Sequence, residues 1–213
     1  MSGPFAKTTL GPPAPSGQDT DKGALIADVQ NGVVEMVDAA GNAHGMQTML
    51  SILQAQTALT TITTAQTLLT LALLANALNR VGRTLQLTGT MIFSTAAANT
   101  PTITITVKLG ATTLCTITSA AVAASTTNGQ LLFQFTLSVA SAGASGTIEA
   151  HGSLLTQLSA TLGTALAEYA DQNTAVSSAV NLTAAQNLTI QISASGGTIA
   201  SAQLRQHTTE VIN

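Results

Sequence analysis

Charged and aromatic residues are scarce in this 213-residue chain. Lys, Arg, Asp and Glu make up 7% of it, against roughly 25% in an ordinary globular domain. Aromatic residues make up 2%, and Trp is missing. The hydrophobic content is 45%, so the chain can bury a core and lacks the low-hydrophobicity, high-charge signature of disorder. A folded chain with so little surface charge is poorly protected against self-association, which favours a protein that works inside an assembly. An extracellular β-protein solvated by hydroxyl groups is the alternative.

Basic residues are too few and too dispersed for nucleic-acid binding. The chain has six Lys and Arg and a formal net charge of −3, and only Arg80 and Arg83 lie close together. Binding to phosphates by counterion release requires a basic stripe. We therefore expect no nucleic-acid partner.

The single cysteine excludes an intrachain disulfide. Cys115 lies in an alternating run, where we expect an inert, buried thiol. The N-terminus does not read as a secretory signal. The apolar stretch 68–75 is too short to cross a bilayer, which takes about 20 apolar residues. It is predicted to be a buried strand, and no membrane partner is expected.

Residues 1–45 differ in composition from the rest and predict an extended N-terminal arm. They contain four of the five prolines, three of them within 11–15. Two apolar runs flank Asn31-Gly32, which predicts a short hairpin near 24–37. Because an isolated hairpin is marginally stable, it must dock on the main domain or on a neighbour. The apolar side chains of the arm are the candidate contacts with a partner: Phe5, Leu10, Leu25, Ile26, Val29, Val33, Val34 and Met36.

Residues 46–65 form a connector whose pattern is ambiguous. Met46, Met49, Leu50 and Leu53 fit helical spacing. From Thr57 onward the density of β-branched residues disfavours a helix. A short helix or an irregular connector is expected.

From residue 66 to residue 213 the pattern is that of β-strands. Apolar and polar residues alternate in 83–93, 102–109, 130–139, 147–154, 187–193 and 202–212. Turn signals rich in Gly, Asn and Pro separate these runs. One polar and one apolar face per strand predict a mainly β fold, an antiparallel β-sandwich with jelly-roll-like wiring. The segment 155–173 is open between a helix and an extended loop.

The three histidines are the first candidates for chemistry. Glu149 and His151 fall on one face of their predicted strand, and Arg205 and His207 on one face of theirs. They would form a small polar cluster if the two strands were neighbours. A metal or catalytic site needs at least three converging groups, which neither these pairs nor His44 provide. Polar surface or interface pairing is favoured.

Glu168 and Asp171, on either side of Tyr169, are a second candidate. They could act as a carboxylate pair, but an exposed loop is favoured. Because no nucleophile, metal-ligand or phosphate-binding motif occurs, we expect no enzyme activity, no catalytic or metal site and no cofactor.

Four stretches resemble a recurring β-sandwich domain of tailed-bacteriophage virion proteins. They are 71–85, which ends in Val81-Gly82-Arg83-Thr84-Leu85; 101–114, which begins Pro101-Thr102-Ile103-Thr104; 143–147; and 182–189, followed by the closing strand 204–213. The resemblance covers residues 66–213. The N-terminal arm does not match the pattern, which leaves the site of attachment undetermined.

The resemblance implies a jelly-roll-like module, usually trimeric, attached to a phage head or tail. The expected function is that of a capsid decoration or cement protein, made in the host cytoplasm, which binds the major capsid protein on the capsid surface as a trimer. The alternative is a head-fibre or tail-fibre module that binds host surface glycans. An enzyme such as a depolymerase is the third possibility.

Overall fold

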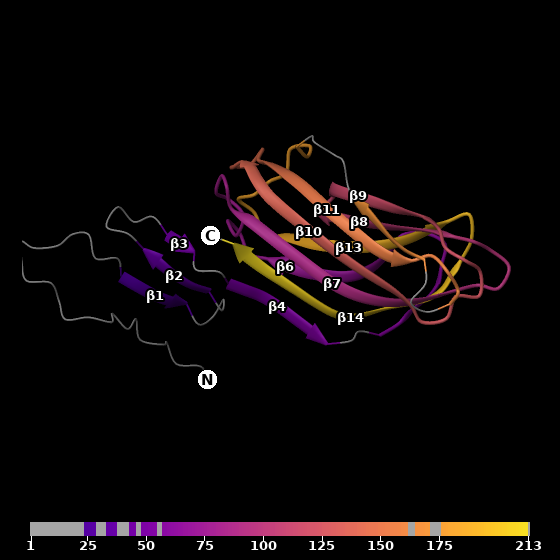
Figure 1. Cartoon of the computed structure of the whole chain (residues 1–213). Coiled ribbons are helices and arrows are strands. Elements are labelled where there is room, and N and C mark those ends of the chain that lie inside the picture. The colour runs from indigo at the N-terminus through magenta and orange to yellow at the C-terminus, as the bar shows by residue number, and fades with distance from the viewer. Residues whose placement is uncertain are drawn as a thin grey trace, which may run out of the picture.

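The computed structural model describes residues 24–28, 33–37, 43–45, 48–54, 57–161, 165–170 and 176–212 (Figure 1). Every regular element among these residues is a β-strand. In the main part of the chain two antiparallel sheets pack against each other, as Figure 1 shows. The antiparallel β-sandwich predicted from the alternating pattern is therefore confirmed.

The smaller sheet has four strands. Its order is β6 (Gln66–Leu73), β13 (Gln186–Ser195), β8 (Thr102–Leu109) and β9 (Thr112–Ala121). The tight turn between β8 and β9 contains Gly110 at φ 57°, which fits the positive φ that a type II′ hairpin turn requires at its first central residue. The apolar stretch around residue 70 thus lies in β6, a strand with a buried face, as predicted.

The larger sheet has seven strands. Its order is β12 (Leu166–Ala170), β11 (Thr147–Gln157), β10 (Gly129–Ser141), β7 (Thr84–Thr95), β14 (Ile199–Ile212) and β4 (Thr48–Gln54), and β5 (Leu59–Ile62) also pairs with β14. From β5 onward the chain crosses between the sheets from β5 to β6, β6 to β7, β7 to β8, β9 to β10, β12 to β13 and β13 to β14. The pairs β8–β9, β10–β11 and β11–β12 each stay within one sheet.

The connector differs from the helical expectation. Residues Thr48–Gln54 form β4, which pairs with β14, for example His207 opposite Leu53. The helical spacing of the apolar residues here is outweighed by the ladder that β14 offers along its free side, because tertiary pairing routinely overrides local propensity. Similarly, Leu166–Ala170 within the open segment is neither helix nor loop but strand β12 at the edge of the large sheet.

The N-terminal part of the chain forms a sheet of its own. Strand β1 (Ala24–Asp28) pairs antiparallel with β2 (Val33–Val37), and β2 pairs with β3 (Ala43–Gly45). The hairpin that Asn31-Gly32 predicts is thus present, although the turn residues themselves lie outside the described ranges. Among the described residues, this sheet shares no backbone pairing with the sandwich.

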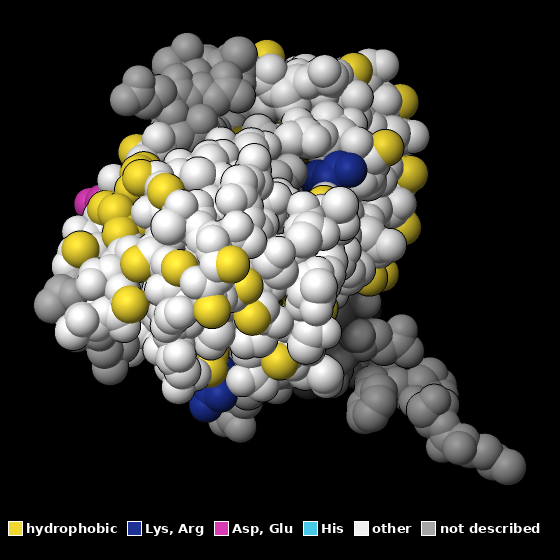
Figure 2. All heavy atoms as spheres, turned by 90° about the vertical axis from the view of Figure 1, so that its right-hand side faces the viewer, with side chains coloured by type: hydrophobic (Ala, Val, Ile, Leu, Met, Phe, Trp, Pro, Cys, Tyr) yellow, Lys and Arg dark blue, Asp and Glu magenta, His cyan; other side chains and the backbone are white. Residues whose placement is uncertain are grey.

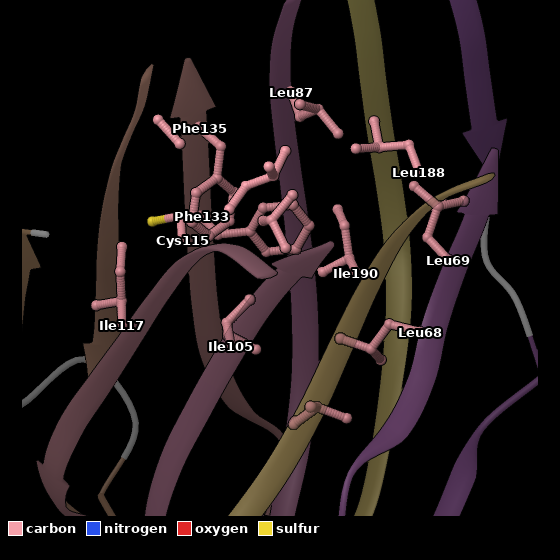
Figure 3. Packing of buried hydrophobic residues seen from close by; sticks show 14 of the residues in the cluster. Leu68, Leu69, Leu87, Ile105, Cys115, Ile117, Phe133, Phe135, Leu188 and Ile190 are labelled. Atoms are coloured by element: carbon pink, nitrogen blue, oxygen red, sulfur yellow. The ribbon is translucent and has the colours of Figure 1, made fainter. Parts of the chain in front are cut away.

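The core lies between the two sheets and follows strict alternation along the strands. On β8 the isoleucines Ile103 and Ile105 are fully buried, while the alternating threonines Thr102, Thr104 and Thr106 are half-buried on the outward face. Figure 3 shows the opposing side chains of the two sheets interlocking, with Phe133 and Phe135 near the centre. Their ring centroids are 5.8 Å apart at an interplanar angle of 39°, within the range of favourable aromatic pairs.

Candidate interaction surfaces

The apolar candidates of the arm are only partly within the described structure. Phe5, Leu10 and Val29 lie outside the described residues. Leu25 and Ile26 are on β1, and Val33, Val34 and Met36 are on β2. The register places Leu25 opposite Met36 and Ala27 opposite Val34. Five of the eight candidates therefore share one three-stranded sheet.

The outward face of the small sheet is a lattice of hydroxyl and amide groups. Thr104 lies opposite Thr118 on β9 and Ser193 on β13, and the Thr104 and Thr118 hydroxyl oxygens are 2.9 Å apart. Thr106 lies opposite Thr116, with the two hydroxyls 3.4 Å apart. Cross-strand Thr pairs of this kind stabilise the sheet and are solvated without charge.

The outward face of the large sheet is also polar, but it carries exposed leucines. Leu132 on β10 and Leu155 on β11 are direct cross-strand partners, and their exposed fractions are 39% and 36%. Leu166 on β12 is 56% exposed and lies two residues diagonally from the position opposite Leu155. Ile92 on β7 is half-buried and diagonal to Leu132. We call these four side chains the leucine band.

Sequence reasoning did not identify the leucine band, although the sequence contains its signal. In a strand of period 2, two consecutive leucines must face opposite sides. In the pair Leu131-Leu132 the first is 2% exposed and the second 39%, and in Leu154-Leu155 the values are 0% and 36%. In these two strands the second leucine of each pair faces outward, whereas in β6, where the register shifts, Leu68 and Leu69 are both buried.

Of the two predicted histidine pairs, the first shares a strand face as expected, but the two pairs do not come together. Glu149 and His151 do share the outward face of β11, with Glu149 Oε1 3.1 Å from His151 Nε2. Both side chains are about half exposed, so this contact contributes little to stability. Strand β11 is separated from β14 by β10 and β7, so the structure does not bring this pair together with Arg205 and His207.

Arg205 and His207 do not share a face, contrary to the prediction. The register of β14 against β7 shifts between Leu204 and Gln206, and this bulge inserts one residue into the alternation. Arg205 is exposed and donates from Nη1 to Gln203 Oε1 at 2.9 Å. His207 instead faces inward and is 2% exposed. Its burial lowers the pKa of the imidazole below the ordinary value of 6.5, because desolvation disfavours the charged form.

The carboxylate pair of residues 168 and 171 is not brought together within the described structure. Glu168 is exposed on β12, while Tyr169 is half-buried and packs against the core. Asp171 lies outside the described residues. The backbone of His44 is described as part of β3, and its side chain is outside the description. Among the described residues no group of three or more His, Cys, Asp or Glu is arranged to hold a metal ion. Cys115 is buried, as expected.

The loops at one end of the sandwich form a firmly held, uncharged surface. The hydroxyl of Thr95 at the end of β7 donates to the Ala123 carbonyl at 2.7 Å and accepts from the Thr126 backbone N–H at 2.9 Å. The hydroxyl of Thr126 donates to the same Ala123 carbonyl at 2.8 Å. Figure 2 shows this end of the molecule, where few charged side chains are visible and hydrophobic side chains are scattered.

One small apolar recess adjoins the small sheet. This recess of about 10 Å³ lies where β6 ends, lined by apolar side chains such as Leu73, Leu78 and Leu182. This volume holds about one water molecule. Within the described ranges, no helix has the length and the apolar character that crossing a membrane requires.

Comparisons with known proteins give no assignment. No protein-family model matches the chain, and neither a curated protein nor a solved structure shows significant similarity to it.

Proposed function

We propose that this chain is a structural protein of a bacteriophage virion, a decoration or cement protein that binds the major capsid protein on the capsid surface and acts as a homo-oligomer, most simply a trimer. The observation that carries the proposal is the separate sheet β1–β3. Its strands have only three to five residues, and even a three-stranded sheet is stable alone only when it has a hydrophobic face to bury. This sheet pairs with no described strand of the sandwich, so we infer that a partner surface covers it.

The connection between the arm and the sandwich supports the same proposal. Strand β4 follows β3 after two residues and pairs with β14 over Gln206–Val211. The arm is therefore tied to the edge of the large sheet by a backbone ladder. A rigid module with a tethered contact segment suits cementing, because each arm adds a second contact whose effective concentration is set by a short link.

The surface chemistry is also that of an assembly component. The outward face of the small sheet is covered by Thr, Ser and Gln, with Lys108 as its one Lys or Arg among the described residues, and the outward face of the large sheet has few charged side chains around the leucine band. Such faces carry little charge repulsion, and in an ordinary monomer they would protect poorly against self-association.

The test is rebinding to shells that lack the protein. Particles assembled without it are mixed with the full-length chain or with a chain starting at residue 46, and bound protein and resistance to heat are measured. We expect the full-length chain to rebind and to raise the disruption temperature, and the shortened chain to do neither. If neither chain binds shells, the cement proposal is wrong.

A fibre module that binds host surface glycans is the second candidate. The uncharged loop end favours it, because its exposed amides and hydroxyls, including Asn99, Thr127 and Asn128, are held on a rigid framework. The described phenylalanines are all buried, which removes the aromatic platform common in sugar sites. Binding of both chains to host cells, with no binding to shells, would favour this candidate.

A further inference from the structure

We propose that the leucine band on the outward face of the large sheet is the surface through which copies of this chain associate. The inference rests on the proposed function, since it assigns the contact that makes the protein a homo-oligomer. Isolated exposed leucines are normal on protein surfaces. Grouped exposed leucines, by contrast, mark an interaction site.

The register groups the band on adjacent strands. Leu132 and Leu155 are directly opposite, and opposite residues in an antiparallel pair have Cβ atoms about 5 Å apart. Leu166 on β12 and Ile92 on β7 extend the band diagonally on either side. The result is a continuous aliphatic strip across β12, β11, β10 and β7, and grouped apolar patches mark interaction sites.

The other sheet provides an internal comparison. Its outward positions are Thr, Ser, Gln, Asn, Ala and Lys, and none of the exposed large hydrophobic residues lies on it. Both faces belong to the same chain and have the same β geometry. The difference between them selects the large sheet as the face that a partner covers.

A second copy is the occupant that the size and charges of this face favour. A face of five strands and about ten residues measures roughly 800 Å² from ordinary sheet spacings, which is the contribution of one partner to a standard interface. Glu168 lies on β12 beside Leu155, and Arg205 lies on β14 on the other side of the band, while Glu149 on β11 and Glu210 on β14 also face outward. A second copy that places its Arg205 against Glu168 pairs an acid with a base across the contact.

The test measures association by sedimentation equilibrium of the full-length protein. L132T/L155T keeps β-forming residues, and L132E/L155E adds two charges. The matched control is T106E/T116E, which places the same charges on a direct cross-strand pair of the small sheet. We expect each leucine variant to weaken association about 100-fold, with the control at wild-type strength. Circular dichroism melting checks that every variant is folded.

A charge exchange identifies the occupant. E168R or R205E alone should weaken association about tenfold, and E168R/R205E together should restore it, because only contact between copies places these two side chains against each other. A wild-type chain that is monomeric at 100 µM, leucine variants that associate as the wild type does, or a double exchange without restoration would each overturn the proposal.

Shell rebinding separates this inference from the proposed function. If the leucine variants associate normally and shells still bind them, the face is wrongly assigned while the cement function stands. If association depends on the band but no chain rebinds shells, the face is correct and the cement function fails.

Discussion

Each phenylalanine that the structure describes lies directly opposite a glycine on the neighbouring strand. A ring that reaches across a glycine fills the space its missing side chain leaves, so the core gains aromatic volume without parting the strands. A Cβ added at Gly89 would overlap the ring of Phe133, and one at Gly129 would lie 2.7 Å from Phe93 Cζ. The three pairs are Phe93–Gly129, Phe133–Gly89 and Phe135–Gly152.

Replacing Gly89 tests this packing. We expect Gly89→Ala to destabilise the protein by about 1–3 kcal/mol, because the added methyl group forces the Phe133 ring out of its position. Phe133→Leu alone should cost about 1–2 kcal/mol through lost volume. The double variant should cost clearly less than the sum, since the smaller side chain leaves room for the methyl group. Urea unfolding measures all three, and strict additivity would show that the ring and the glycine are not coupled.

The buried imidazole of His207 predicts a pH dependence of stability. Its pKa is lowered in the folded protein, so below pH 6.5 the unfolded chain binds more protons than the folded one. Its contribution to stability is therefore fully present above pH 6.5 and is lost as the pH falls from there toward the folded pKa, at up to about 1.4 kcal/mol per pH unit.

His207→Gln should flatten the decline in unfolding free energy between pH 7.5 and pH 5.5. His151→Gln is the control, because His151 is half exposed on the outward face. Urea unfolding across this pH range distinguishes them. An unchanged slope in His207→Gln, or an equal flattening in His151→Gln, would contradict the assignment.

At the level of elements, the loop between β9 and β10 is held by hydroxyl groups in addition to the buried side chain of Val122. Thr95→Val keeps the shape of the side chain and removes both hydrogen bonds of its hydroxyl, leaving the buried N–H of Thr126 unpaired. We expect the free energy of unfolding to fall by about 2–4 kcal/mol, since a buried donor left without a partner adds its desolvation penalty to the lost hydrogen bonds.

Thr90→Val on the outward face of the same strand is the matched control and should change stability by less than about 0.5 kcal/mol. Amide hydrogen exchange gives a second readout, in which the Thr126 N–H should lose protection in Thr95→Val. Retained protection there would show that the loop is held by other contacts.

How well each element could be predicted depended on whether its partners were local. Strand β8 was predicted with its observed limits, because alternating Thr and Ile residues encode a strand with one buried face. Strand β4 could not be distinguished from a helix, because Met49, Leu50 and Leu53 fit a helical face and the ladder that decides the matter is on β14, more than 140 residues away in sequence. Strand β12 is short and is likewise defined by its pairing with β11.

For the candidate surfaces, too, prediction from the sequence succeeded only where the interacting residues were close together in the chain. The Glu149–His151 contact was predictable, because it depends only on two positions of one strand. The opposite orientations of Arg205 and His207 were not, because the bulge in β14 arises from its fit to β7. Nor does sequence reveal that the two polar pairs are kept apart by β10 and β7. The leucine band could have been predicted from its doubled leucines, once the strands were known.

In the molecule as a whole, the core and the arm are separate in sequence. Among the side chains that the structure describes, the buried hydrophobic residues of the core lie between Ile62 and Leu204, and the backbone of β4 pairs with β14. Because β1–β3 share no backbone pairing with the described strands of the sandwich, we expect the sandwich to fold without them. Strand β4 has a different role, since it covers a long stretch of β14 that would otherwise be an open edge.

Two truncations separate these roles. A chain of residues 46–213 should unfold at nearly the same urea concentration as the full-length protein, because it retains both sheets and β4. A chain of residues 57–213 should be less stable and should aggregate at lower concentration, because β14 then exposes unpaired backbone groups opposite Ser51–Gln54. Unfolding midpoints and light scattering measure the two effects. If residues 46–213 fail to fold, the arm belongs to the folding unit; if residues 57–213 match the longer chain, β4 is part of the arm and leaves with it when the arm binds a partner.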